Sequence, residues 1–226
     1  MKNLNRVRLT RWIWIVLPVA IMLLFQRAIV GSIALVSRIS GGIDPSVFFY
    51  LPFLSLLPPL VLFLIWYLRP ARGHEAKLVI TVRGKVVRDV GLGLGGAVLC
   101  VAVFIGSLKL LRALSLPTPD FSSLSWVHHL FFSTIGALVP GIAEEVYFRG
   151  FLMQKLGDLQ PTLLIVMTSA SFAFWHILSP PYLLHTFLVG LILGIIYYRT
   201  RRLLPIITAH TMANASAGVL FLVGYR

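Results

Sequence analysis

Acidic residues are scarce in this chain of 226 residues. Asp and Glu together number seven, against twenty Lys and Arg, and all charged residues make up only 12% of the sequence. Hydrophobic residues make up 58%. A soluble domain of this size needs more charge to cover its surface, so the composition excludes a soluble globular protein and indicates an all-α polytopic membrane protein.

Cysteine is also nearly missing. The single Cys100 lies in an apolar run, which excludes an intramolecular disulfide and gives no sign of a thiolate enzyme. The net charge of +13 could suggest nucleic acid, but the cations lie in short clusters between apolar runs. That pattern is typical of cytosolic loops beside anionic lipid. We therefore expect a multi-pass protein of the cell membrane with lipids as partners and no nucleic acid.

The apolar runs predict a bundle of about seven transmembrane helices. Four runs are read directly, and three further helices are expected to begin at a proline in the first helical position. The runs are about 12–36, 47–68, 90–108 and 124–156, and the prolines are Pro161, Pro181 and Pro205. Glycines at 91, 93, 95 and 96 predict close helix contact in the third run.

The basic clusters predict the orientation. Most Lys and Arg fall on one side if the N-terminus is cytosolic, although Lys109 and Arg112 fall on the other. The most polar stretch, 69–89, then forms a cytosolic loop, and its portion LVITVRGKVVRDV fits either an interfacial amphipathic helix or a short hairpin. We divide this single membrane domain into N-terminal helices with the basic loop, 1–123, and a helical core, 124–226, that holds the candidate site.

Two of the few acidic residues, Glu144 and Glu145, stand side by side in an apolar segment. One acidic side chain in mid-membrane costs roughly 2.5–3.5 kcal/mol, so the pair implies buried partners or a watery cavity. Glu145 can pair with Arg149 one helical turn later, while Glu144 points about 100° away and is left free. Pro140 could break or start a helix just before the pair. The plainer interpretation is an ion pair that locks helices together.

Helical rise predicts that His176 lies opposite Glu144. The fourth and fifth helices should form an antiparallel hairpin that turns near Gln160, and both residues lie sixteen positions from that turn. Each is therefore about 24 Å along its own helix. Phe172 lies one turn before His176 and can pack under its imidazole.

The last helix pair brings His210 and Asn214 to a similar depth. They lie about 14 Å and 20 Å beyond a turn near Arg201, on one helical face. The depths converge if the charged end of the fourth helix protrudes into the cytosol. A lone intramembrane His or Asn usually makes an interhelical hydrogen bond, so only the whole set predicts a site. His185 is expected in a supporting or structural role, and His128 and His129 at the interface.

Three ordered motifs resemble those of a known family. EEVYFRG (144–150), FAFWH (172–176) and HTMAN (210–214) are similar to the EExxxR, FxxxH and HxxxN motifs of the CPBP family, the CAAX proteases and bacteriocin-processing enzymes. The resemblance covers about the last hundred residues. It implies an intramembrane endopeptidase whose peptide or protein substrate is membrane-associated or lipid-modified, prenylated CAAX proteins being the substrates of eukaryotic members.

The resemblance also implies a role for each motif residue. Glu144 would be the general base for water and His176 would bind the same water, while His210 and Asn214 would donate to the oxyanion. Arg149 would hold Glu145. This mechanism needs no cofactor and no metal. The alternative is a zinc-dependent protease in which Glu144, His176 and His210 bind the metal.

Two interpretations from other classes stand beside the protease. A transporter or channel also places carboxylate and His in mid-membrane, but it should show inverted repeats, and the sequence has none. A non-catalytic immunity or scaffold protein would use the same fold without needing intact motifs, whereas here every motif position is intact.

Overall fold

The computed structural model describes residues 82–116, 125–176 and 183–222, positions 80 and 118, and single positions between 13 and 65. The chain divides into two compact units, Met1–Arg72 and Gly73–Arg226. The first two predicted spans, 12–36 and 47–68, lie largely outside the described residues, as does Pro181. The helices that carry the predicted site residues all belong to the second unit.

The second unit is helical wherever it forms regular structure, with no strand in the described ranges. Its elements are α3 (Val86–Ala113), α4 (Trp126–Ser133), α5 (Ile135–Glu145), a π-helical segment (Val146–Leu152), α6 (Met153–Lys155), α7 (Pro161–Trp175), α8 (Leu183–Thr200) and α9 (Leu203–Leu222). Among the described residues, four stretches are long and apolar enough to cross a membrane: Val86–Ala113, Trp126–Lys155, Leu183–Thr200 and Leu203–Leu220. The predicted all-α membrane class is confirmed, while the total of seven spans and the cytosolic N-terminus stay predictions.

The column from α4 to α6 corresponds to the predicted fourth span. Its helical path breaks at Thr134, which has φ −117° and ψ −97° and whose hydroxyl donates to the carbonyl of Leu130 at 2.6 Å. Pro140 lies inside α5 and neither starts nor ends it, so the expectation of a break there was wrong. The Glu pair therefore ends α5 and runs directly into the π-helical segment.

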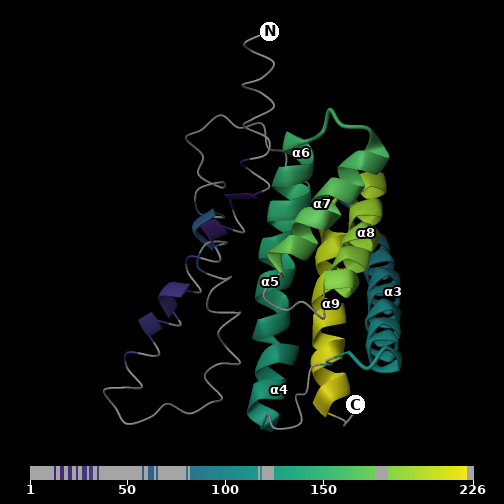
Figure 1. Ribbon diagram of the computed structural model, residues 1–226. Coiled ribbons are helices and arrows are strands. Elements are labelled where there is room, and N and C mark those ends of the chain that lie inside the picture. Colours follow the sequence, from purple (N-terminus) through teal and green to yellow (C-terminus); the bar gives the residue numbers. More distant parts are fainter. Residues whose placement is uncertain are drawn as a thin grey trace. The chain divides into compact units, whose positions relative to one another are not determined.

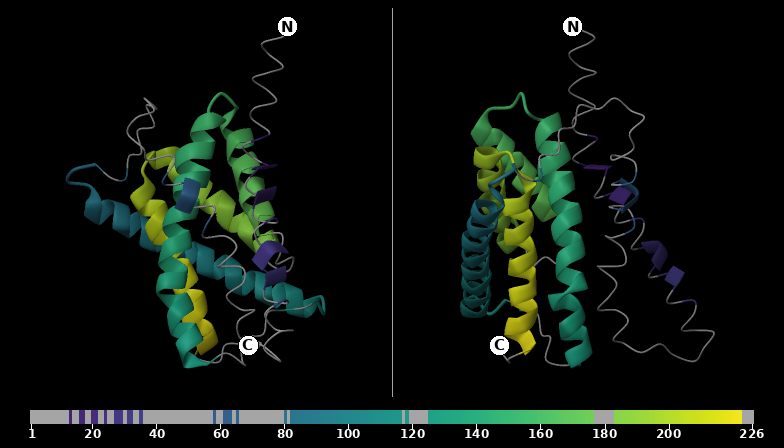
Figure 2. Two further views of the ribbon diagram at one scale, coloured as in Figure 1. Left: turned by 90° about the vertical axis from the view of Figure 1, so that its left-hand side faces the viewer. Right: turned by 180° about the vertical axis from the view of Figure 1, so that it is seen from behind.

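Helix α9 is the centre of the unit, with α3, α4, α5 and α8 packed around it. In Figure 1 it lies between α5 and α3, and Figure 2 shows α3 crossing α9 and the α4–α6 column at a steep angle. Glycine allows that crossing: a Cβ on Gly93 would lie 2.7 Å from the carbonyl oxygen of Pro205, and one on Gly96 would lie 3.0 Å from the Cβ of Ala209. Gly91 and Gly95 face no atom within 4 Å, so the predicted contact holds for two of the four.

The first turns of α3 and α9 are tied together. The buried Asp89 carboxylate lies 2.7 Å from the guanidinium of Arg202, and the Leu204 N–H donates to the Ile80 carbonyl at 2.8 Å. Helix α9 begins two residues before Pro205, the predicted start, because a proline within the first turn loses no intrahelical hydrogen bond. The stretch 78–90 was predicted to form either an interfacial amphipathic helix or a short hairpin. Its residues 86–90 instead form the first turn of the long helix α3.

Candidate active site

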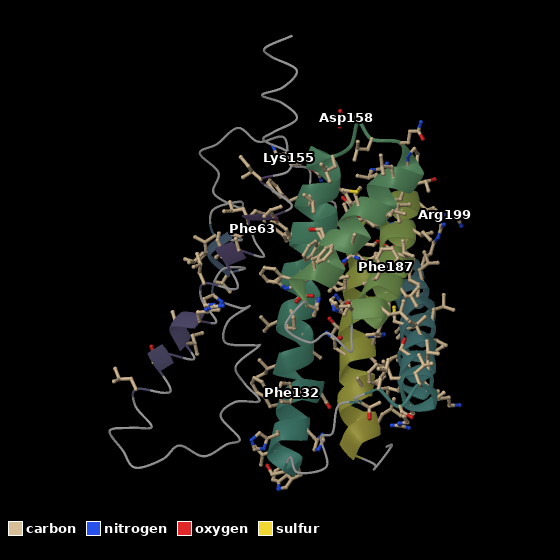
Figure 3. All side chains as sticks on the ribbon, viewed as in Figure 1. Phe63, Phe132, Lys155, Asp158, Phe187 and Arg199 are labelled. Atoms are coloured by element: carbon tan, nitrogen blue, oxygen red, sulfur yellow. The ribbon has the colours of Figure 1, made fainter. Side chains whose placement is uncertain are left out.

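The Glu pair and its arginine are completely enclosed by the bundle. Glu144 is 1% exposed, and Glu145 and Arg149 are 0% exposed. They lie midway along the α4–α6 column: Figure 3 shows Phe132 towards one end of that column and Lys155 at the other. Side chains with full charges at this position need partners inside the protein.

Arg149 forms the ion pair with Glu145 that the helical spacing predicted. Its Nη1 donates to Glu145 Oε1 at 2.7 Å, and its Nη2 donates to the backbone carbonyl of Gly190 on α8 at 3.0 Å. The guanidinium also lies 4.8 Å from the centre of the Phe172 ring on α7. One side chain thus joins three helices, which fixes the carboxylate it holds.

The segment that carries Arg149 is π-helical, and all seven of its residues are buried. A π-helix makes i→i+5 hydrogen bonds, is rare in proteins, and frequently lies at a functional site. It changes the phase of the helix beyond Glu145, so the later side chains point differently from those of a continuous α-helix. Hydrophobic periodicity carries no sign of such a change.

The two motif histidines are each oriented through Nδ1. His210 Nδ1 lies 2.8 Å from Glu145 Oε1, and His176 Nδ1 lies 2.9 Å from the Phe172 carbonyl oxygen. The Phe172 ring packs edge-on against both imidazoles, with centroids 4.9 Å from His176 and 5.7 Å from His210. His176 directly follows α7, and its side chain is 24% exposed, against 5% for His210.

Glu144 faces both imidazoles with one oxygen. Its Oε2 lies 3.8 Å from His210 Nε2 and 4.0 Å from His176 Nε2. These distances are too long for direct hydrogen bonds. Its Oε1 accepts the indole N–H of Trp175 at 3.3 Å. The structure therefore brings Glu144, His176 and His210 together from three helices, as their depths predicted.

The hydrogen bonds at Nδ1 determine which ring nitrogen of His176 and of His210 points a lone pair into the site. A carbonyl and an ionised carboxylate only accept, so each Nδ1 must be the donor. In a neutral ring Nε2 then carries a lone pair, and both lone pairs meet Glu144 Oε2, which has no hydrogen-bond partner within the described ranges. Three acceptors that face one another require shared protons or a cation between them.

Asn214 is the least constrained of the predicted site residues. It follows His210 by one turn on α9, is half-buried, and forms no hydrogen bond with another residue of the described part. Its predicted contact with an oxyanion stays a prediction.

Two other histidines lie inside the protein. His185 on α8 packs against Phe104 with centroids 5.2 Å apart, and its expected supporting role stays a prediction. His129 is only 6% exposed, while its predicted depth at the membrane interface stays a prediction. It is buried because α4 packs against α9 and turns this side chain inward.

Sequence reasoning missed Trp175, although this residue touches the central carboxylate. The motif pattern leaves its position open, and its apolar ring suits a membrane helix. A usable signal exists: a buried indole N–H needs a hydrogen-bond acceptor, and acidic side chains, which are strong acceptors, are rare in this chain.

The donor set matches zinc chemistry in type but not in spacing. Metal-bound histidines commonly donate their second nitrogen to a carboxylate or a carbonyl, as His210 and His176 do here. Ligand atoms on a tetrahedral zinc are about 3.3 Å apart. Glu144 Oε2 lies 3.8 Å and 4.0 Å from the two Nε2 atoms, and no three His, Cys, Asp or Glu in the described ranges lie close enough to hold a metal ion.

Comparison with known proteins identifies one family. Residues 126–216 match the family described as Rce1-like, type II CAAX prenyl endopeptidase Rce1-like. The matched segment runs from the start of α4 into α9 and includes the six predicted site residues. No curated protein and no solved structure matches the chain. The CPBP resemblance is confirmed over this segment, and it indicates a membrane protease at the family level.

Proposed function

We propose that this chain, whose segment 126–216 is of the Rce1-like type, is an intramembrane endopeptidase that cleaves a membrane-associated or lipid-modified substrate with a glutamate-activated water. One observation carries the proposal: a buried carboxylate oxygen, Glu144 Oε2, lies between two oriented imidazoles at 3.8 Å and 4.0 Å. A polar contact of this length fits a bridging water.

In the proposed reaction Glu144 accepts a proton from that water as its oxygen attacks the scissile carbonyl carbon. His176 Nε2 accepts a hydrogen bond from the second O–H of the water and orients it. The carbon–nitrogen bond then breaks, and the proton on Glu144 passes to the leaving nitrogen. The products are a new carboxylic acid and a new amine, which become carboxylate and ammonium by proton exchange, and Glu144 returns to its starting state.

In this proposal His210 and Asn214 donate hydrogen bonds to the oxyanion. Because His210 Nδ1 already donates to Glu145, its Nε2 can donate only when the ring is an imidazolium. Arg149 neutralises Glu145, which leaves Glu144 as the carboxylate available to act as the base.

A zinc-dependent reaction is the second candidate, and the orientation of the two imidazoles favours it. Glu144, His176 and His210 would hold the ion, which would supply Lewis-acid activation of the water. Glu144 Oε2 would have to approach the two Nε2 atoms by about 0.5–0.7 Å. The two candidates separate in one experiment: full cleavage after treatment with a strong chelator supports the glutamate mechanism, and activity that disappears and returns with zinc supports the metal.

The substrate class can be tested in membranes. Cells with wild-type protein and cells with the Glu144→Ala variant should differ in a peptide or protein that accumulates uncleaved only in the variant. Arg199→Gln, a change at an exposed position of α8, is the control and should match wild type. Identical membranes in all three would favour a non-catalytic immunity or scaffold protein.

A further inference from the structure

The indole of Trp175 is placed against the proposed base. Trp175 is the last residue of α7 and is 1% exposed. Its Nε1 donates to Glu144 Oε1 at 3.3 Å. Its ring packs edge-on against Phe148 of the π-helical segment, with centroids 6.2 Å apart. The indole is therefore held in place by α7, to which Trp175 belongs, and by the π-helical segment that follows Glu144 and Glu145.

This contact makes the two oxygens of Glu144 unequal. Oε1 has a fixed donor, whereas Oε2 faces the Nε2 atoms of His210 and His176 at 3.8 Å and 4.0 Å. A glutamate side chain has several rotatable bonds, and a carboxylate held at one oxygen can present the other in only a narrow range of directions. An indole N–H can only donate, so it cannot take a proton from the base or compete with it for water.

We propose that Trp175 is a positioning residue, which anchors Glu144 through Oε1 so that Oε2 meets the water between the two imidazoles. The activity part of this inference rests on the proposed function, but the hydrogen bond itself does not. A purely structural tryptophan would need only its ring, and phenylalanine would largely replace it. A positioning tryptophan also needs its N–H.

The matched variants are Trp175→Phe and Trp126→Phe. The first removes the indole N–H and keeps an aromatic ring, and the second makes the same change on α4, where Trp126 is 67% exposed. With a fluorogenic prenylated CAAX peptide as the probe, Trp175→Phe should lower kcat about 10- to 100-fold with KM within about twofold. Trp126→Phe should keep both constants. A wild-type kcat in Trp175→Phe would overturn the inference.

The hydrogen bond has its own readout in protein labelled with ¹⁵N-tryptophan. The Trp175 indole resonance, identified as the one lost in Trp175→Phe, should move in Glu144→Gln because a charged acceptor becomes a neutral amide. The Trp126 resonance should stay. An unmoved Trp175 resonance would overturn the inference even if the peptide is cleaved. If the resonance moves but wild-type protein does not cleave the probe, the hydrogen bond is supported and the result counts against the proposed function. If Trp175→Phe does not fold, wild type and Glu144→Gln are compared directly: one indole resonance other than the one lost in Trp126→Phe should move, and no moved resonance would overturn the inference.

Discussion

Two buried acid–arginine pairs in this protein have the same contact distance and different surroundings. Glu145–Arg149 and Asp89–Arg202 both close at 2.7 Å with side chains less than a tenth exposed. The second pair joins the first turn of α3 to the residue just before α9. The first lies where α5 ends and the π-helical segment begins, and Glu144 and the imidazole of His210 are also buried there.

The difference lies in the balance of charge. At Asp89 and Arg202 the contact joins one carboxylate and one guanidinium. Around Arg149 there are two carboxylates, and the second, Glu144, faces imidazole nitrogens beyond direct hydrogen-bonding distance. A structural pair explains Glu145 but not Glu144. The extra carboxylate is the feature that indicates chemistry.

The predictions test this contrast, from the largest expected change in stability to the smallest. Arg149→Gln should lower the free energy of unfolding by about 3–5 kcal/mol, because the buried carboxylate of Glu145 loses its cation. Cleavage should be lost as well. Thermal or chemical unfolding in detergent and a peptide assay measure the two effects, with Arg199→Gln as the exposed control. Wild-type stability in Arg149→Gln would show that this pair does not hold the bundle together.

Asp89→Asn should destabilise the fold but spare the reaction. It leaves the buried Arg202 without its carboxylate, which should cost about 2–4 kcal/mol. Per folded molecule, kcat should stay within about twofold of wild type, since neither residue contacts the site. In the double variant Asp89→Asn/Arg202→Gln, the loss in free energy of unfolding should be smaller than the sum of the losses in the two single variants. A large loss of kcat at full folding would mean that the two pairs are not separate in function.

Gly190→Ala should have an intermediate effect on stability. The new Cβ would lie 3.0 Å from Ser169 Cβ and 3.1 Å from Ser169 Cα, so α7 and α8 must move apart. That movement should cost about 1–3 kcal/mol. It would also displace the carbonyl that accepts from Arg149, and so reduce cleavage. Gly95→Ala, with no atom within 4 Å, is the matched control and should change neither quantity.

Asn214→Ala should change stability least, because this half-buried residue makes no hydrogen bond within the described part. Its expected effect is on the reaction: loss of an oxyanion donor lowers kcat about 10²- to 10³-fold. A steady-state assay at matched folded concentration checks it. An unchanged kcat would remove Asn214 from the oxyanion site and leave the role of Glu144 intact.

Local helical geometry made much of the site predictable. The spacing of Glu145 and Arg149 predicted their ion pair, Pro161 marked the start of α7, and the rise per residue placed Glu144 opposite His176. Each of these depends on one helix or on one hairpin. Such relations can be worked out from spacing alone.

Contacts set by packing between distant elements could not be predicted. The Asp89–Arg202 pair joins ends of helices far apart in sequence, and the π-helical segment and the break at Thr134 depend on local backbone choices that periodicity does not encode. His129 was predicted at the interface because its sequence position is near a helix end, and its burial follows only from the packing of α4 on α9.

The most direct test of the central claim is the cleavage rate of purified Glu144→Gln beside wild type, at equal amounts of folded protein and with the substrate found in membranes. We predict no detectable cleavage and an unfolding temperature at or above that of wild type, because the change removes a buried charge and keeps the shape of the side chain. Cleavage at the wild-type rate would contradict a catalytic role for Glu144.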